Sequence, residues 1–313
     1  MAEADDRSVH RPVQVENVRR LLALPPSGRL LDLTLGAGGH TEDLLGRTEG
    51  ATVVGVDRDP AILEIAARRL AGFGDRVRTV CSPFDRLDAI CDACGVDRFD
   101  AILIDLGVSS LQLDDAERGF SFDRDGPLEM RMGPDAPRSA ADLVNRGSRE
   151  ELMHAVRTLG DEPRAARVVE AILEARRAAP IRRTCELADL VKRVVRGPSH
   201  HHPATRTFQG LRMAVNDELG MVERTLPRAI DRLREGGRLA VLAFHGGEDR
   251  LVKRAFRDAE RAGLVSVITA KPLAPEASEV RDNPRARSSR LRGVERVRSG
   301  VDGERPSAGK RRE

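Results

Sequence analysis

The sequence contains no tryptophan and no tyrosine, and its eight phenylalanines are its only Phe, Trp or Tyr residues. Proteins that stack aromatic side chains on several nucleic acid bases need more such residues than this chain has. The few candidates for stacking on a single base are the phenylalanines nearest to recognisable motifs, namely Phe120, Phe122, Phe208 and Phe244.

Cysteine is scarce as well, because four cysteines are too few for a disulfide scaffold in a chain of 313 residues. Cys91 and Cys94 form a C-x-x-C motif, but no second pair with zinc-ligand spacing follows it. On a helix this spacing only places both side chains on one face. We therefore interpret the two cysteines as packing residues and predict no metal site.

Long apolar runs are also absent. No segment approaches the roughly 18 consecutive apolar residues of a membrane span, and the start "MAEADDRSVHRPV" lacks the apolar core of a signal peptide. The hydrophobic content of 40% suits a globular protein of one large domain or two smaller ones. We therefore expect a cytoplasmic protein with no membrane partner.

The net charge is only +3, but the charges are unevenly distributed. Residues 85–135 are acidic, with 13 acidic and 5 basic side chains. Residues 176–212 are basic, with 9 basic and 2 acidic side chains, and so are residues 281–313, with 11 basic and 5 acidic side chains. Basic zones that neutralise phosphates give salt-dependent affinity for a polyanion. Solvated helix faces and a loose tail account for the same distribution equally well.

Short, β-rich apolar runs alternate with helical patterns in the first third of the chain. The runs occupy residues 28–35, 51–57, 76–81 and 99–106, and stretches such as "PAILEIAARRLAGFG" separate them. This alternation predicts an α/β fold with a doubly wound, mostly parallel sheet.

The strand pattern stops after Asp105 and resumes only at "GGRLAVLAF", residues 236–244. A gap this long is not a structureless loop of a compact domain, so it predicts an inserted domain that is mainly helical. We expect "LVSVITA" and "SRLRGVERV" to complete the sheet. The predicted boundaries are 1–111 and 206–299 for the two parts of the sheet domain, 112–205 for the insertion and 300–313 for a disordered tail.

The segment "LDLTLGAGGHTEDLL", residues 31–45, is a strand that turns into a helix through a glycine cluster. Gly36 stands at the sharp turn, and Gly38 and Gly39 remove side chains so that a ligand can approach the backbone amides. The next strand ends in Asp57, near the ~20-residue spacing at which an acid binds ribose hydroxyls. Together these features predict an adenosine-containing ligand, although a glycine loop alone also suits a plain tight turn.

The loop pattern discriminates between adenosine ligands. A dinucleotide fingerprint requires a glycine where Thr41 stands, and the G-x-x-x-x-G-K-[ST] motif of a triphosphate site is absent from the sequence. S-adenosylmethionine has no phosphate and remains compatible with the loop. Asp32, at the end of the first strand, lies either near the cationic methionine portion of this ligand or in the turn as a cap.

The fourth strand ends at Asp105, at the edge of the sheet where open α/β proteins bind their ligands. Methyl transfer to an exocyclic amine needs a hydrogen-bond acceptor there, because the lone pair of such a nitrogen is delocalised into the ring. Asp105 is our first candidate for this catalytic acceptor. The alternative is that it only caps the following turn.

Long motifs extend from about His10 to Val297. They include "DLTLGAGGHT", "GVDRDP", "FDAILIDLGVSSLQLDDAERGFSFDRDGPLEMRM", "HPATRTFQGLRMAVNDEL" and "NPRARSSRLRGVER". These motifs resemble the RsmH (MraW) family of 16S rRNA (cytosine-N4)-methyltransferases, class I S-adenosylmethionine-dependent enzymes. The resemblance implies the S-adenosylmethionine cofactor, an inserted helical substrate-recognition domain, and cytosine 1402 of 16S ribosomal RNA, within the small subunit, as the target.

The same resemblance implies a set of cofactor contacts at matching positions. These positions are Gly38, Gly39, His40, Asp57, Phe84, Asp105 and Gln112. Two of them have a plain structural alternative, because Phe84 also suits core packing and His40 also suits the start of a helix.

Candidate RNA contacts follow the fifth predicted strand and lie in "HPATRTF". They are Arg206, Phe208, His245, Glu248, Asp249, Arg250 and Lys253. The three adjacent histidines at 200–202 are interpreted as a solvated loop, since they do not converge as metal ligands. "NPRARSSRLR" is either an RNA-facing edge strand or an ordinary surface strand.

Several positions depart from the usual pattern of the family. Leu33, Leu111 and Gly133 replace a small residue, a proline and an aspartate, and "FHGGEDR" stands where the family usually has F-H-S-L-E-D-R. We expect Gly246 and Gly247 to loosen that loop and to remove substrate contacts. This departure keeps a second hypothesis open, an RNA-binding or ribosome assembly factor with weak turnover, and a small-molecule methyltransferase is a third. The oligomeric state stays open.

Overall fold

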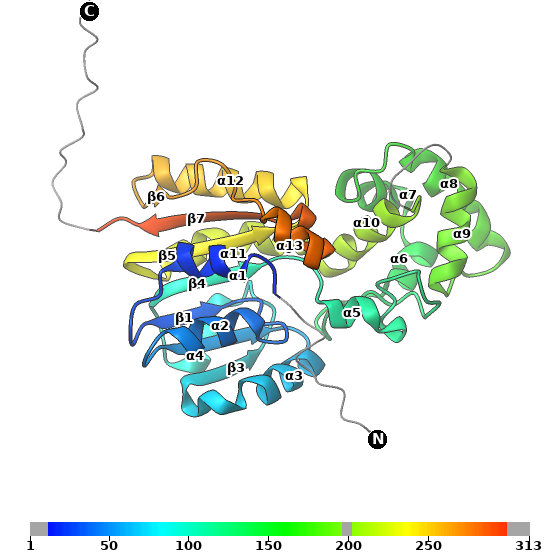
Figure 1. Cartoon of the computed structure of the whole chain (residues 1–313). Coiled ribbons are helices and arrows are strands. Elements are labelled where there is room, and N and C mark those ends of the chain that lie inside the picture. The colour runs from blue at the N-terminus through cyan, green and yellow to red at the C-terminus, as the bar shows by residue number, and fades with distance from the viewer. Residues whose placement is uncertain (1–11, 196–201, 299–313) are drawn as a thin grey trace, which may run out of the picture.

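Seven strands form one sheet in the order β3-β2-β1-β4-β5-β7-β6, with helices on both of its faces (Figure 1). The structure is a computed structural model that describes residues 12–195 and 202–298. The strands are β1 Arg29–Asp32, β2 Thr52–Asp57, β3 Val77–Cys81, β4 Phe99–Asp105, β5 Leu233–Ala243, β6 Val265–Val267 and β7 Arg290–Arg296. Neighbouring strands among β1–β5 are parallel, and β7 is antiparallel to β5 and β6. The sheet confirms the predicted doubly wound, mostly parallel α/β fold.

The central strands are buried on both faces, which explains their nearly continuous apolar sequences. In β4, Ile102 and Ile104 belong to one apolar cluster, whereas Ala101 and Leu103 belong to another. The first cluster includes residues of α4 Leu87–Cys94, α11 Glu218–Asp231 and α12 Gly246–Arg261. The second includes residues of α1 Val15–Leu22 and α2 Gly39–Arg47. A smaller cluster joins α3 Pro60–Leu70 to the loop after β1.

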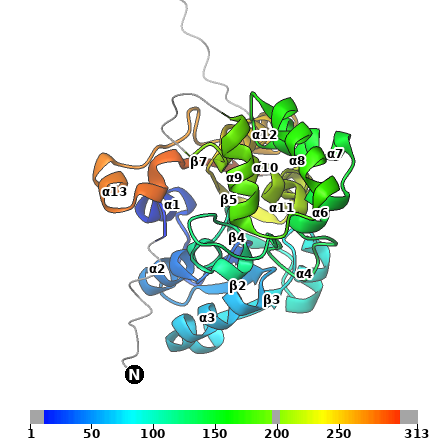
Figure 2. The same cartoon turned by 90° about the vertical axis from the view of Figure 1, so that its right-hand side faces the viewer.

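The chain between β4 and β5 forms a second, helical layer with its own apolar cluster, which runs from Phe120 to Val215. Its helices are α5 Ser110–Asp114, α6 Ala140–Arg146, α7 Arg149–Met153, α8 Ala165–Ala178, α9 Thr184–Val194 and α10 Thr205–Asn216, with a π-helical turn His154–Leu159 after α7. Figures 1 and 2 show α6–α10 gathered at one end of the sheet, beyond the carboxyl ends of the parallel strands. The predicted boundary at residue 205 stays a prediction, and the helical cluster includes Phe208, Leu211 and Val215 of α10.

No helix within residues 12–195 and 202–298 combines the length and the apolar character that crossing a membrane requires. The predicted disordered tail and His200 and His201 lie outside the described residues. His202 is described, and its Nδ1 accepts a hydrogen bond from the Ala204 amide at 3.2 Å. The remaining helix, α13 Ala277–Asp282, lies between β6 and β7 in the chain.

Candidate active site

Three aspartates end three adjacent parallel strands. Asp32 ends β1, Asp57 ends β2 and Asp105 ends β4. The chain continues from β1 to β2 and from β4 to β5, in opposite directions across the sheet. A reversal of this kind leaves a crevice at the carboxyl ends of the strands, where open α/β proteins bind ligands. The structure thus brings Asp57 and Asp105 to one edge, with Asp32 on the strand between theirs.

The loop from β1 to α2 is held against the end of β2. Gly36, with φ of 54°, and Gly38, with φ of 81°, have left-handed backbone conformations that favour glycine. The Gly36 amide donates a hydrogen bond to Asp57 Oδ2 at 2.9 Å. The predicted sharp turn therefore lies directly beside the acid that ends the second strand.

Gly38 and Gly39 are packed against other parts of the chain. A Cβ atom at Gly38 would lie 2.9 Å from Leu70, and one at Gly39 would lie 2.9 Å from Pro12. The absent side chains thus make room for this chain's own residues in addition to any ligand. α2 begins at Gly39, and no side chain in the described part of the protein caps it. The amides of its first turn, which lack partners within the helix, are therefore available to a bound molecule.

Burial raises the pKa of Asp57 and of Asp32. It raises the pKa of Asp57 to about 6, against the hydrogen bonds that its carboxylate accepts from backbone amides. It also raises the pKa of Asp32 to about 6, although the Thr41 hydroxyl donates to Asp32 Oδ2 at 2.8 Å. Asp32 is 1% exposed, and its other oxygen accepts from the Thr34 amide at 3.3 Å. Asp32 therefore serves the turn as a cap.

The side chains of His40 and Asp105 lie close together, but some of their buried polar atoms lack hydrogen-bond partners. His40 Nε2 lies 3.6 Å from Asp105 Oδ2, which is too far for a good hydrogen bond. Within the described residues, both ring nitrogens of His40 and Oδ1 of Asp105 are buried and have no hydrogen-bond partner. The Asp105 amide donates to Thr34 Oγ1 at 2.6 Å, which fixes the end of β4. Unpartnered buried atoms are rare, and three at one place indicate a site for a polar ligand.

A buried acid that the sequence analysis missed joins this edge to the helical layer. Asp59 is 2% exposed, and its Oδ1 accepts from the Ala61 amide at the start of α3. Its Oδ2 accepts from Gln112 Nε2 at 3.1 Å and forms an ion pair with Arg118 at 2.7 Å. The side chain of Gln112, a predicted cofactor contact, is therefore held by Asp59 in this structure.

Arg58, the neighbour of Asp59, makes a second connection and was also missed. It forms an ion pair with Asp135 and donates to the Asn216 carbonyl at 3.1 Å. The Asn216 side chain in turn holds the carbonyl of Met130 and the amide of Met132. The sequence "GVDRDP" marks Arg58 and Asp59 as two charged residues that directly follow the predicted ribose acid, but it does not indicate their partners.

Phe84 follows β3 and is half-buried against the apolar cluster of α4 and α11. This packing is the structural alternative considered for it, and a contact to adenine stays a prediction. An aromatic ring that is partly buried and partly exposed at the ligand edge is compatible with both.

His245 and Glu248 build the start of α12. His245 Nδ1 accepts from the amides of Gly247 and Glu248, at 3.2 and 3.4 Å, and Glu248 Oε2 accepts from the Phe244 amide at 2.8 Å. Gly246 and Gly247 are thus the first turn of a capped helix, instead of the loosened loop that we expected. A Cβ atom at Gly247 would lie 3.1 Å from the His245 ring, so a larger side chain would require that ring to shift by a few tenths of an ångström.

The carboxylate of Asp249 is bound by two arginines of this protein. It accepts from Arg292 Nε at 2.7 Å and from Arg290 Nη1 at 3.3 Å, which ties α12 to β7. Burial raises the pKa of Asp249, but the two guanidinium groups outweigh burial and keep the pKa below its usual value. "NPRARSSRLR" therefore ends in a strand whose arginines partly face inward, and a direct RNA contact by Asp249 stays a prediction.

The remaining RNA candidates lie on different elements. Arg206 is exposed on α10 and donates to the Asp161 carbonyl at 3.0 Å. Phe208 is 4% exposed and meets Phe122 edge-on, with 4.9 Å between the ring centres, so its ring is part of the helical cluster. Lys253 lies on α12. Substrate roles for these side chains stay predictions.

The edge fits S-adenosylmethionine. Asp57 would offer a carboxylate to ribose hydroxyls, and the uncapped start of α2 would offer amide donors. The unpartnered atoms belong to His40, at the start of α2, and to Asp105, at the end of β4, and such buried polar atoms would suit the methionine end of the cofactor and the acceptor of the methyl group. No group of three metal-binding side chains occurs within residues 12–195 and 202–298.

The sheet order, the antiparallel β7 and the glycine loop beside an acid at the end of β2 define a class I S-adenosylmethionine-dependent methyltransferase. The model of the MraW methylase family matches residues 7–297. The chain belongs to the MraW methylase family, and S-adenosylmethionine is its cofactor.

Three named relatives are similar in sequence to this chain over nearly its whole length. A protein of Acidothermus cellulolyticus is 46% identical over 93% of this chain and 94% of its own. Proteins of Heliobacterium modesticaldum and Oleidesulfovibrio alaskensis are 42% and 45% identical, over 92% and 93% of this chain and 99% and 96% of their own. Each of the three bears the name ribosomal RNA small subunit methyltransferase H. The predicted family resemblance is thereby confirmed.

Proposed function

We propose that this protein methylates the N4 amine of a cytosine, cytosine 1402, in 16S ribosomal RNA of the small subunit. The names of relatives that are 42–46% identical over nearly their whole length support ribosomal RNA as the substrate. The observation that carries the proposal is the buried, unpartnered Oδ1 of Asp105 at the carboxyl end of β4. The proposed reaction belongs to the cytoplasm, where ribosomal subunits are.

Asp105 is suited to activate an exocyclic amine. When bound, S-adenosylmethionine supplies a methyl group that its sulfonium centre makes electrophilic. The Asp105 carboxylate accepts a hydrogen bond from N4–H, which turns the nitrogen lone pair away from the ring and toward the methyl carbon. As the N–C bond forms and the C–S bond breaks, the nitrogen becomes positive, and the carboxylate stabilises that charge and accepts the proton.

The affinity for the cofactor is expected to fall below about pH 6. Burial raises the pKa of Asp57 to about 6, and only the ionised carboxylate accepts hydrogen bonds from both ribose hydroxyls. Because protonation then competes with binding, Kd should rise by up to about tenfold for each pH unit below this pKa and stay level above it. Calorimetry between about pH 5 and 8 checks the profile.

The control for this profile is Asp57→Asn, which keeps the shape of the side chain but does not titrate. Its affinity for the cofactor should be low, and its Kd should change little with pH over the same range, although Asp32, with a pKa also raised to about 6, still titrates. A wild-type Kd that does not change as the pH falls to about 5 would remove Asp57 from ribose binding.

The proposed reaction is tested with cofactor labelled in its methyl group and small ribosomal subunits from cells that lack this protein. We expect label in 16S ribosomal RNA, located at the N4 position of one cytosine by mass spectrometry of the digested RNA. A parallel assay with naked RNA shows whether the assembled subunit is required. Absence of transfer despite measurable binding of cofactor and subunits would instead support an assembly factor.

A further inference from the structure

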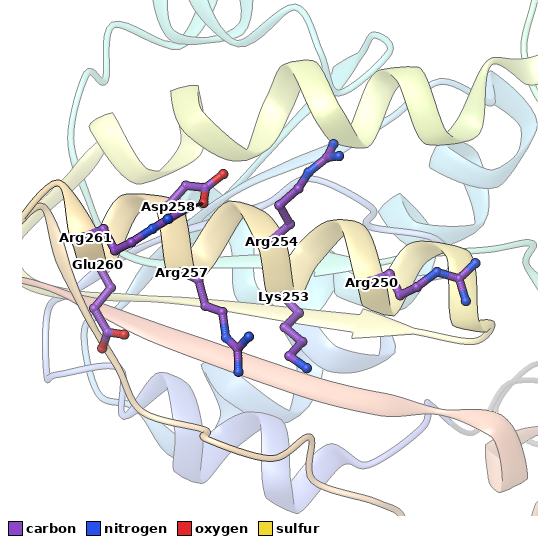
Figure 3. A pocket seen from close by; sticks show the side chains of 7 residues that line it. All are labelled: Arg250, Lys253, Arg254, Arg257, Asp258, Glu260 and Arg261. Atoms are coloured by element: carbon purple, nitrogen blue, oxygen red, sulfur yellow. Dashed lines mark hydrogen bonds and ion pairs between the residues drawn. The ribbon is translucent and has the colours of Figure 1, made fainter.

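The exposed side of α12 carries five basic side chains in helical register. They are Arg250, Lys253, Arg254, Arg257 and Arg261. Spacings of three and four residues place such side chains on neighbouring turns of one face. Together with Asp258 and Glu260 they line a shallow hollow of about 700 Å³ (Figure 3).

Three of these cations lack a counter-charge. Arg254 forms an ion pair with Glu223 and Arg261 forms one with Asp258. Arg250, Lys253 and Arg257 form no ion pair with any residue in the described part of the chain. Lys253 and Arg257 extend from the same side of α12, whereas Arg254 extends toward α11 (Figure 3).

Two arginines on or directly after the neighbouring helix α11 form ion pairs, whereas Arg228 of α11 forms none with the described residues and donates to the Asp85 carbonyl at 3.3 Å. On α11, Arg224 forms ion pairs with Asp85 and Asp217. Arg232, directly after α11, pairs with Asp88. Arg250, Lys253 and Arg257 on α12 thus differ from Arg224 and Arg232, whose charges are offset by neighbouring carboxylates.

A second, smaller hollow continues the first. It has a volume of about 240 Å³ and shares Lys253, Arg257 and Glu260 with the larger hollow, and Val267, Thr269 and Arg292 also line it. The Glu260 carboxylate accepts a hydrogen bond from the Val267 amide at 3.0 Å. The two unpaired cations thus line a groove between α12 and the chain that follows β6. A groove with cations along one wall suits a chain of negative charges better than a single small anion.

The groove begins near the catalytic edge. α12 follows β5 after two residues, and Leu242 of β5 lies opposite Asp105 in the sheet. At 1.5 Å per residue, the row from Arg250 to Arg257 extends about 10 Å away from that edge. A strand of nucleic acid that has one base at Asp105 and continues along the exposed side of α12 would meet these cations.

We propose that Arg250, Lys253 and Arg257 form a phosphate-binding row that holds the RNA backbone beside the nucleotide to be methylated. The proposal rests on the proposed function for the identity of the polyanion as RNA. Because the row offers charges and no aromatic ring, it binds phosphates without reading bases. It lies outside both basic zones that the sequence had indicated.

The test is a triple variant, R250Q/K253Q/R257Q, in which glutamine keeps the helix propensity of α12. The matched control, R20Q/R47Q/R68Q, removes the same charge from α1, α2 and α3, which belong to other apolar clusters than α12. Anisotropy of a fluorescein-labelled RNA fragment that contains the target cytosine is measured over a range of salt concentrations. Calorimetry monitors the affinity for S-adenosylmethionine, which should be unchanged in both variants.

For the α12 variant we expect affinity for RNA to fall on the order of 10- to 50-fold at physiological salt. The slope of log Kobs against log salt should become shallower by about 2, since each phosphate on a single strand contributes about 0.7. The control variant should change the affinity by less than about threefold.

The outcomes separate this proposal from the proposed function. Equal affinity and slope for the two triple variants overturn the phosphate-binding row and leave the methyl transfer untouched. If the wild-type protein binds the RNA through the row but transfers no methyl group to 16S ribosomal RNA, the proposed function fails alone. Absence of RNA binding by the wild-type protein, or preferential binding to vesicles of anionic phospholipid, overturns the row as an RNA site.

Discussion

Replacement of Asp105 by alanine is expected to reduce the rate of methyl transfer by about 10²- to 10⁴-fold, the contribution typical of a positioned acid or base. The variant loses the carboxylate that ends β4, whose Oδ1 is buried and has no hydrogen-bond partner among the described residues. The amine of the target base then keeps its lone pair in the ring and has no group to receive its proton. Affinity for the cofactor should change by less than about tenfold, because Asp57 and the start of α2 remain.

Single-turnover transfer to small subunits at saturating cofactor measures this effect, with calorimetry as the check on cofactor affinity. Asp105→Asn retains an acceptor oxygen without the charge, so its rate should lie between those of the wild type and the alanine variant. Asp100→Ala is the matched control, since Asp100 lies at the opposite end of β4 and forms an ion pair with Arg234. Full activity of Asp105→Ala would remove this residue from the mechanism.

The fold could be predicted from the sequence because each part of it has a local cause. The apolar runs that became β1, β2 and β4 are continuous because both faces of the sheet are covered, and the helical patterns between them have the amphipathic period. The long interruption after Asp105 likewise has a local signature, the absence of strand patterns. Such signals lie within about 15 residues of sequence and require no knowledge of distant neighbours.

The network around Asp59 could not be predicted in the same way. Asp59 and Arg118 are far apart in sequence, and nothing in the sequence around either one indicates the other. The same holds for Asp249, which looks like a site residue in its motif but is held by Arg292 of a distant strand. A motif identifies the residue types of a site. Which other residues bind those side chains depends on tertiary packing, which the motif does not show.

Counting charges along the chain has a related weakness. The segments 176–212 and 281–313 are basic in sequence, but some of their arginines form ion pairs within the protein, as Arg183 does with Asp125 and Arg292 does with Asp249. The motif named Arg250 and Lys253 as candidate RNA contacts, but the charge count did not single out the row on α12, because acidic residues directly before and after it offset its charge. Helical periodicity, and not the summed charge of a window, is the informative pattern at a surface.

Replacement of Asp59 by alanine is expected to reduce kcat/KM by about 100-fold, because the helical layer would no longer be held in a fixed position relative to the cofactor site. The variant leaves Gln112 Nε2 and the Arg118 guanidinium without their acceptor and uncaps α3. Loss of a cap and of a largely buried charged pair should also lower the free energy of unfolding by about 2 kcal/mol. Steady-state kinetics well below the melting temperature separates the two effects.

The kinetic pattern distinguishes positioning from mere loss of stability. The Asp59 side chain holds the start of α3, Gln112 and Arg118. Within the described residues, it forms no hydrogen bond with the carboxylate of Asp57 or of Asp105. A positioning role therefore predicts a lower kcat and a higher KM for RNA, with the Kd for cofactor nearly unchanged. Asp59→Asn, which can still cap α3 and accept from Gln112, should recover part of the loss, whereas the Asp100→Ala control should show a change in stability alone. If Asp59→Ala shifted the melting temperature but left kcat and KM at wild-type values, the contact between the two layers would be structural and the geometry of methyl transfer would be set within the sheet domain.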